Sequence, residues 1–96
     1  MAKSEFLEHL RDLLSGPDGL ADLDIRRAFN GHGLYEGGVL FGWVWDDEDV
    51  LQLKRVVERT RSGKQKRVAY SPVPAETLDD TGQLMHLVRE ALADLP

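Results

Sequence analysis

The sequence contains no cysteine among its 96 residues. This absence excludes disulfides, thiol nucleophiles and thiolate metal sites, and it suits a reducing compartment. Long apolar runs are also missing, since no stretch approaches the roughly 20 apolar residues that span a bilayer. The first residues, Met1 to Ser4, lack the apolar core of a secretory signal. We therefore expect a soluble, cytoplasmic protein that makes no membrane contact.

The length of the chain fits one domain, which we expect to cover residues 1–96. Hydrophobic residues make up 42% of the sequence and charged residues 30%, which is typical of a folded globular protein. A domain this small has a thin stability margin because it buries a modest share of its surface. Dimerisation would add stability, so a homodimer is one expected assembly.

Charge is distributed unevenly along the chain, whose formal net charge is −5. Residues 54–67, here called the basic segment, hold seven of the twelve basic residues and one acid, Glu58. The segment therefore carries +6, and the rest of the chain carries −11. The overall acidity argues against a generally basic nucleic-acid binder, but the basic segment itself could contact phosphates.

Apolar residues recur with helical spacing near both ends of the chain. From Ser4 to Leu14 they fall at i, i+1, i+4, i+7 and i+8, and Gly16-Pro17 ends this pattern. Near the C-terminus, Asp80 with Gln83 makes a capping-box-like start to a second apolar stripe that reaches Leu95. One amphipathic helix is predicted at each end.

The region between these helices has the period of strands. Strands are expected over 25–29, 39–45, 50–57 and 66–70, and Gly37-Gly38 predicts a hairpin turn. In the first of these strands, Phe29 is expected to point to the same side as Ile25. The order of elements predicts a two-layer α+β domain with an N-terminal helix, an antiparallel sheet of four to five strands and a C-terminal helix.

The strand expected over 39–45 is apolar on both faces. Alternation places Val39, Phe41, Trp43 and Trp45 on one face and Leu40, Gly42 and Val44 on the other. Such a strand is typically central in a sheet, so we expect the tryptophans to be buried under the helices. An exposed tryptophan would instead be a candidate anchor for a partner.

No group of residues has the pattern of a catalytic site. His32 lies between two glycines without a spaced ligand or nucleophile, and we interpret it as a turn or bulge residue. The acidic run from Asp46 to Asp49 lacks the alternating ligands of a calcium loop and fits a solvated turn. The glycines between residues 31 and 42 lack the spacing of a phosphate loop. We expect no enzymatic activity, no metal and no cofactor.

Two binding surfaces remain open at this stage. One is the basic segment, whose candidate contacts with a partner or with nucleic acid are Arg55, Arg59, Arg61, Lys64, Lys66 and Arg67. The alternative interpretation of these residues is a solvated edge hairpin, because basic side chains protect sheet edges from aggregation. The other is a small-ligand site in the glycine-rich hairpin near His32 and Tyr35.

A family resemblance rests on residues 27–42, Arg-Ala-Phe-Asn-Gly-His-Gly-Leu-Tyr-Glu-Gly-Gly-Val-Leu-Phe-Gly. This stretch resembles the R-x-M-F-G-G-x-G-[IL]-Y-x-[DG]-G-x-M-F signature of the TfoX/Sxy N-terminal domain family. The later segments Tyr70-Ser-Pro-Val-Pro and Leu78-Asp79-Asp80 are also similar to that family. Several residues of this chain match the signature at the same spacing, and we interpret them as structural: Phe29, Gly31, Gly33, Leu34, Tyr35, Gly38 and Phe41.

The main departure lies between Lys54 and Ser62, where the family generally has a longer segment with a helix of its own. We therefore expect a short hairpin in place of that helix. The resemblance implies a secretion-chaperone-like α+β fold with no catalytic residues. Longer members regulate natural competence and act with the cyclic-AMP receptor protein at promoters, and they carry a second domain beyond the point where this chain ends. The resemblance thus implies a protein-interaction module in transcription regulation, with the transcription machinery as a partner.

Overall fold

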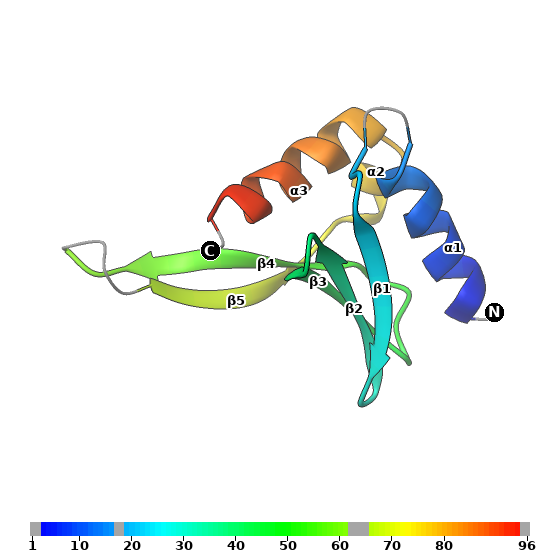
Figure 1. The fold of residues 1–96 in the computed structure, drawn as a ribbon, viewed down its shortest axis with the longest axis horizontal. Helices are drawn as coiled ribbons and strands as arrows, with labels where there is room; N and C mark the ends of the chain where they lie inside the picture. Colours follow the sequence, from blue (N-terminus) through cyan, green and yellow to red (C-terminus); the bar gives the residue numbers. More distant parts are fainter. Residues whose placement is uncertain (1–2, 17–18, 62–65, 95–96) are drawn as a thin grey trace.

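The computed structural model describes residues 3–16, 19–61 and 66–94 (Figure 1). The candidate contact Lys64 lies outside these residues. Within these ranges, three helices and five strands follow one another: α1 (Lys3–Leu14), β1 (Leu23–Ala28), β2 (Gly31–Glu36), β3 (Val39–Trp45), β4 (Gln52–Arg59), β5 (Lys66–Pro72), α2 (Ala75–Leu78) and α3 (Thr81–Asp94).

The five strands form one sheet in the order of the sequence, β1-β2-β3-β4-β5, and every neighbouring pair is antiparallel. A helix precedes this sheet and two helices follow it. The predicted α+β class, with an N-terminal helix, an antiparallel sheet and a C-terminal helix, is confirmed. The short helix α2 was not expected, and β1 begins at Leu23, two residues earlier than predicted.

The helices lie together on one side of the sheet (Figure 1). Helix α3 packs on β3 and β4, and α1 packs against α3. The amphipathic stripes supply the helical half of the core, and β2, β3 and the start of β4 supply the other half. Its fully buried large side chains are Leu10, Leu14, Leu34, Phe41, Val44, Leu51, Leu53, Leu84 and Val88.

Two local predictions from turn and cap chemistry agree with the structure. Gly37 and Gly38 connect β2 to β3 with φ of 57° and 84°, a conformation that glycine adopts without steric cost. At the start of α3, the backbone N–H of Gln83 donates to Oδ1 of Asp80 at 3.1 Å, as an N-cap requires. Local chemistry therefore fixes where these elements begin and end.

A β-bulge in β3 overturns the predicted assignment of its faces. Leu34 pairs with Gly42 and Tyr35 pairs with Leu40, so Phe41 has no partner of its own in β2. Phe41 and Gly42 both lie opposite Leu34 and share one face, so the alternation of side chains along β3 shifts by one residue. Phe41 is consequently buried with Val44, whereas Trp45 is 41% exposed. The expectations that both tryptophans share a face with Phe41, and that they are buried under the helices, were wrong.

Phe29 also differs from its prediction. It is not a strand residue beside Ile25 but the first residue of a two-residue turn between β1 and β2. Its φ is 54°, and its side chain is 92% exposed. A bulky L-residue seldom adopts a positive φ, because its Cβ then crowds the neighbouring carbonyl oxygen. The structure thus holds a strained aromatic residue at the tip of a hairpin.

Strands β4 and β5 pair along their whole length, from Gln52 with Pro72 to Arg59 with Lys66. The two strands form a hairpin, as expected for this part of the chain. It extends away from the helices and forms one end of the molecule (Figure 1). The described part of the basic segment, residues 54–61 and 66–67, lies on or next to this hairpin.

Candidate functional site

The face of the sheet away from the helices, here called the outer face, carries a groove between aromatic side chains. Its lining residues, here called the aromatic groove, are Phe29, Leu40, Trp43, Trp45 and Tyr70, which enclose about 280 Å³. Because the Phe41 bulge shifts the alternation, Leu40 and both tryptophans emerge on this face.

Glycines in β2 make room for these side chains. A Cβ on Gly31 would lie 2.7 Å from Cζ2 of Trp43 and 2.6 Å from the carbonyl oxygen of Val44. A Cβ on Gly33 would lie 3.0 Å from Cε1 of Tyr35 and 3.1 Å from Cδ1 of Leu40. Glycine normally weakens a strand, and here it allows large side chains to lie directly on the backbone. These two glycines therefore belong to the construction of the groove.

The two indoles give the groove a fixed floor. The rings of Trp43 and Trp45 meet edge to face, with centroids 5.3 Å apart and planes at 71°. This geometry is favoured because the positive edge of one ring faces the negative face of the other. Nε1 of Trp43 is buried and has no hydrogen-bond partner among the described residues, so the apolar contacts of this ring are what hold it. The floor of the groove is thus apolar.

Tyrosines and an arginine border the groove. Partial burial raises the pKa of the Tyr70 phenol above its usual value near 10, and the charge of an ionised Tyr35 raises it further. The guanidinium of Arg26 lies 5.0 Å from the centroid of the Tyr35 ring and is paired with Asp24 at 2.7 Å. The Arg26 contacts place a cation over the Tyr35 ring at the outer edge of the face.

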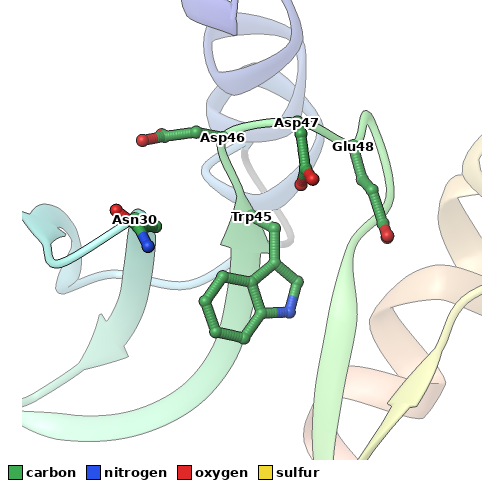
Figure 2. Close-up of a pocket in the computed structure, with 5 residues that line it drawn as sticks. All are labelled: Asn30, Trp45, Asp46, Asp47 and Glu48. Atoms are coloured by element: carbon green, nitrogen blue, oxygen red, sulfur yellow. The ribbon is translucent and has the colours of Figure 1, made fainter.

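An acidic pocket lies next to the aromatic groove. It is lined by Asn30, Trp45, Asp46, Asp47 and Glu48 and encloses about 440 Å³ (Figure 2). The carboxylates of Asp47 and Glu48 point to the same side of the loop as the Trp45 ring, whereas Asp46 points away from them (Figure 2). We call Asp46, Asp47 and Glu48 the acidic corner. Trp45 lines both pockets, so the groove ends in negative charge.

Asp46 contacts residues of the β1–β2 hairpin through its side chain and its backbone. Its two carboxylate oxygens accept from the two terminal nitrogens of Arg27 at 3.3 and 3.0 Å. Oδ1 also lies 3.7 Å from Nδ1 of His32, an atom that is buried and has no hydrogen bond within the described residues. The backbone N–H of Asp46 donates to the carbonyl of Asn30 at 2.8 Å. This arrangement joins the end of β3 to the β1–β2 hairpin and has the geometry of a structural ion pair.

The structure separates the residues of the predicted small-ligand site. His32 pairs with Val44, which is fully buried on the helix side, and the His32 side chain is 15% exposed. Tyr35 pairs with Leu40 and lies against Gly33 on the outer face. His32 and Tyr35 therefore lie on opposite faces of the sheet and do not share one site.

Among the six basic candidates, the structure describes the side chains of Arg55, Arg61 and Arg67. Lys54 pairs with Tyr70 and Arg55 pairs with Ala69, so Arg55 lies on the opposite face from Tyr70 and is half-buried. Arg67 lies three residues before Tyr70 in β5, so it is on the face opposite Tyr70, and it is exposed. Arg61, just beyond β4, is exposed as well. The backbones of Arg59 and Lys66 pair near the far end of the hairpin.

Two general features concern the described residues only. Within 3–16, 19–61 and 66–94, no three histidine, aspartate or glutamate side chains are placed to hold a metal ion. None of the helices in those ranges has the length and apolar character to cross a bilayer.

The aromatic groove was not predicted from the sequence. A signal for it was nevertheless present: Gly31 and Gly33 alternate in β2 while Trp43 and Trp45 alternate in β3. Small residues facing large ones across paired strands indicate rings that cover the backbone. Comparisons of the chain with family models, with curated proteins and with solved structures find no match.

Proposed function

We propose that this chain is a non-enzymatic protein-interaction module that engages its partner through the outer face of the sheet. The observation that carries the proposal is the exposure of the aromatic groove, with Phe29 at 92%, Trp45 at 41% and Tyr70 at 39%. Water-exposed aromatic side chains that gather over a rigid floor are typical of the anchors of protein interfaces.

The strain at Phe29 supports the same proposal. A positive φ is unfavourable for phenylalanine, and the exposed ring makes little contact that would offset this cost in the isolated chain. Strained residues concentrate where a binding partner uses the side chain. Arg27 and Asp46, in contrast, contact each other as an ion pair at the base of the same hairpin.

The regulatory context of the proposal comes from the resemblance of residues 27–42 to the TfoX/Sxy N-terminal domain. On that basis we place the module in the cytoplasm, in transcription or competence-type regulation, with the transcription machinery among its targets. The five-stranded antiparallel sheet with helices on one side is compatible with this assignment.

The test compares the wild type with the double variant Phe29→Ser/Trp45→Ser in binding to purified RNA polymerase and purified cyclic-AMP receptor protein, and in self-association. His9→Ser, on the exposed side of α1, is the matched control. We expect an association that the double variant loses and the control retains. If every association of the wild type is unchanged in the double variant, the outer face is not an interface and the proposal is wrong.

Direct nucleic-acid binding through the basic segment is a second candidate. It is favoured by the projection of the β4–β5 hairpin from the rest of the molecule, with Arg61 and Arg67 exposed (Figure 1). Such binding would weaken steeply with added salt, because each phosphate contact releases counterions. Failure of the chain to bind duplex DNA or RNA at low salt would exclude it.

A further inference from the structure

We propose that the outer face binds an extended peptide segment of another protein, with an apolar side chain of the segment in the aromatic groove and a lysine or arginine of it against Trp45 and the acidic corner. This inference rests on the proposed function, because it names the class of partner that occupies the same groove. Three features carry it: two adjoining subsites, the charges at the two ends of the groove, and the exposed ring of Trp45.

The aromatic groove and the acidic pocket adjoin each other. Two consecutive residues of the β1–β2 turn divide between them, since Phe29 lines the groove and Asn30 lines the pocket. Trp45 lines both, and the carboxylates of Asp47 and Glu48 point to the same side of the loop as its ring (Figure 2). The hollows enclose about 280 and 440 Å³, so each has room for one large side chain. An extended chain advances about 3.3 Å per residue, so residues a few positions apart can fill neighbouring hollows.

The charges differ between the two ends of this surface. At the Trp45 end, the acidic corner carries three carboxylates, of which that of Asp46 is paired with Arg27. At the other end, Lys54 is the cross-strand partner of Tyr70 and therefore lies on the same face. A cation of the partner is thus attracted to the Trp45 end and repelled from the Tyr70 end. The charges therefore fix the end of the groove at which a basic residue of the partner lies.

The ring of Trp45 suits a basic side chain in particular. It is 41% exposed, and its edge-to-face contact with Trp43 fixes the position of the ring. A guanidinium or ammonium group over an indole face is attracted by the ring quadrupole, and tryptophan is the best aromatic residue for this contact. The methylene groups of arginine and lysine also cover apolar surface. A basic residue thus gains cation–π, apolar and ionic contacts in one place, whereas an acidic residue would meet repulsion there.

Two subsites of different chemistry favour a peptide over a small cation. A free amine in the acidic pocket would leave the aromatic groove open, with the Phe29 ring 92% exposed to water. An extended segment covers both hollows, because it carries an apolar and a basic side chain on one backbone. Recognition of extended segments by pockets for individual side chains is a recurring mode of peptide binding.

The experiment selects binders from a displayed library of random nonapeptides on the full chain and on the charge-reversed variant Asp47→Lys/Glu48→Lys. The matched control, Glu8→Lys/Asp12→Lys, makes the same change in net charge on exposed positions of α1, on the other side of the sheet (Figure 1). The peptide most enriched on the wild type is then titrated into each protein, with tryptophan fluorescence as the readout. A second form of that peptide has its basic residue replaced by glutamate. Circular dichroism confirms that each variant is folded.

We expect the wild type and the control to select peptides in which a lysine or arginine lies within about three residues of a large apolar residue. Asp47→Lys/Glu48→Lys should select the apolar residue without the basic one. It should bind the wild-type peptide at least about 30-fold more weakly, because an attractive charge contact becomes repulsive, and should prefer the glutamate form. Added salt should weaken the complex of the wild type.

Several outcomes would overturn the inference. If the wild type enriches no peptide, an extended segment is not the partner. Enriched peptides without a basic residue, or an affinity that Asp47→Lys/Glu48→Lys leaves unchanged, exclude the assigned position of the cation. Arginine amide that binds as tightly as the peptide assigns the pocket to a small cation.

A second copy of the chain is the other occupant that the test can reveal. If the wild type dimerises in sedimentation equilibrium and Phe29→Ser/Trp45→Ser does not, a second copy covers the face and the inference is wrong. In all of these cases the proposed function still stands if Phe29→Ser/Trp45→Ser loses an association that the wild type makes. The failure of the inference and the failure of the proposed function are therefore distinguishable.

Discussion

Replacement of Phe29 by glycine should change monomer stability and association in opposite directions. Phe29 has a φ of 54° and is 92% exposed. A positive φ costs an L-residue about 1–2 kcal/mol, while glycine adopts it freely but loses about 0.5–1 kcal/mol more backbone entropy on folding. We therefore expect Phe29→Gly to stabilise the monomer by about 0.5–1 kcal/mol, which corresponds to a rise in Tm of about 2–8 °C.

The same substitution should weaken every association that uses the outer face. A phenylalanine ring buries about 150–250 Å² when covered, and this ring is almost fully available. At about 25 cal/mol per Å², its complete burial would contribute about 3–6 kcal/mol per ring as an upper limit. Interface side chains seldom reach that limit, so we expect a loss of about 2 kcal/mol, or about 30-fold in affinity.

Urea denaturation at low protein concentration measures the first effect, and sedimentation at high concentration measures the second. Phe29→Ala is the matched control, since it removes the ring but keeps a Cβ at positive φ. It should lose association as Phe29→Gly does and gain no stability. A Phe29→Gly monomer that is less stable than the wild type would show that the exposed ring contributes to monomer packing, and the reasoning would be refuted.

Three further predictions concern the floor of the groove, a helix and a phenol. Gly31→Ala places a Cβ 2.7 Å from Trp43, so it should lower the free energy of unfolding by about 1–3 kcal/mol in urea denaturation and alter tryptophan fluorescence. A Cβ on Gly82 in α3 would lie 3.6 Å from Oδ1 of Asp80, an ordinary contact distance, so Gly82→Ala should instead raise that free energy by about 0.5–1 kcal/mol. This variant is the control for the loss of a glycine. The folded state raises the pKa of Tyr70, so its contribution to stability is complete below the unfolded value near pH 10 and is lost as pH rises through the folded pKa. The wild type should therefore lose stability relative to Tyr70→Phe above pH 10, and the phenolate absorbance of Tyr70 should appear at a higher pH than that of a model tyrosine. If the free energy of unfolding depends on pH in the same way in the wild type and in Tyr70→Phe, this assignment is wrong.

The elements of the fold were predictable where local chemistry determines them. The helical stripes, the Gly37-Gly38 turn and the Asp80 cap each depend on neighbouring residues, and they agree with the structure. The faces of β3 were not predictable from alternation, because the strand is apolar on both faces and either face could be the inner one. The bulge at Phe41 depends on pairing with Leu34, which is a tertiary choice that no local pattern records.

The candidate site was less predictable than the fold for the same reason. The basic segment attracted attention because its charges are adjacent in the sequence, yet alternation places Arg55 on the opposite face from Tyr70. The aromatic groove depends on side chains from the β1–β2 turn, β3 and β5, which only the completed sheet brings together. The alternation of Ile25, Arg27 and Phe29 assigned Phe29 to a strand. Its positive φ could not be predicted, because phenylalanine disfavours this conformation and a prediction based on residue preferences misses such a case.

The bulge in β3 also decides the register of a strand that is apolar on both faces. A strand with apolar residues on both faces does not specify its own register, and a slip of one residue would exchange its inner and outer side chains. In the slipped strand, Trp43 and Trp45 would fill the core and Val44 would face solvent. Phe41 and Gly42, by sharing one position opposite Leu34, hold the strand in the phase that leaves the indoles outside. Exposure of the groove is therefore a selected alternative between two ways of folding the same strand, and whatever covers the indoles also stabilises that choice.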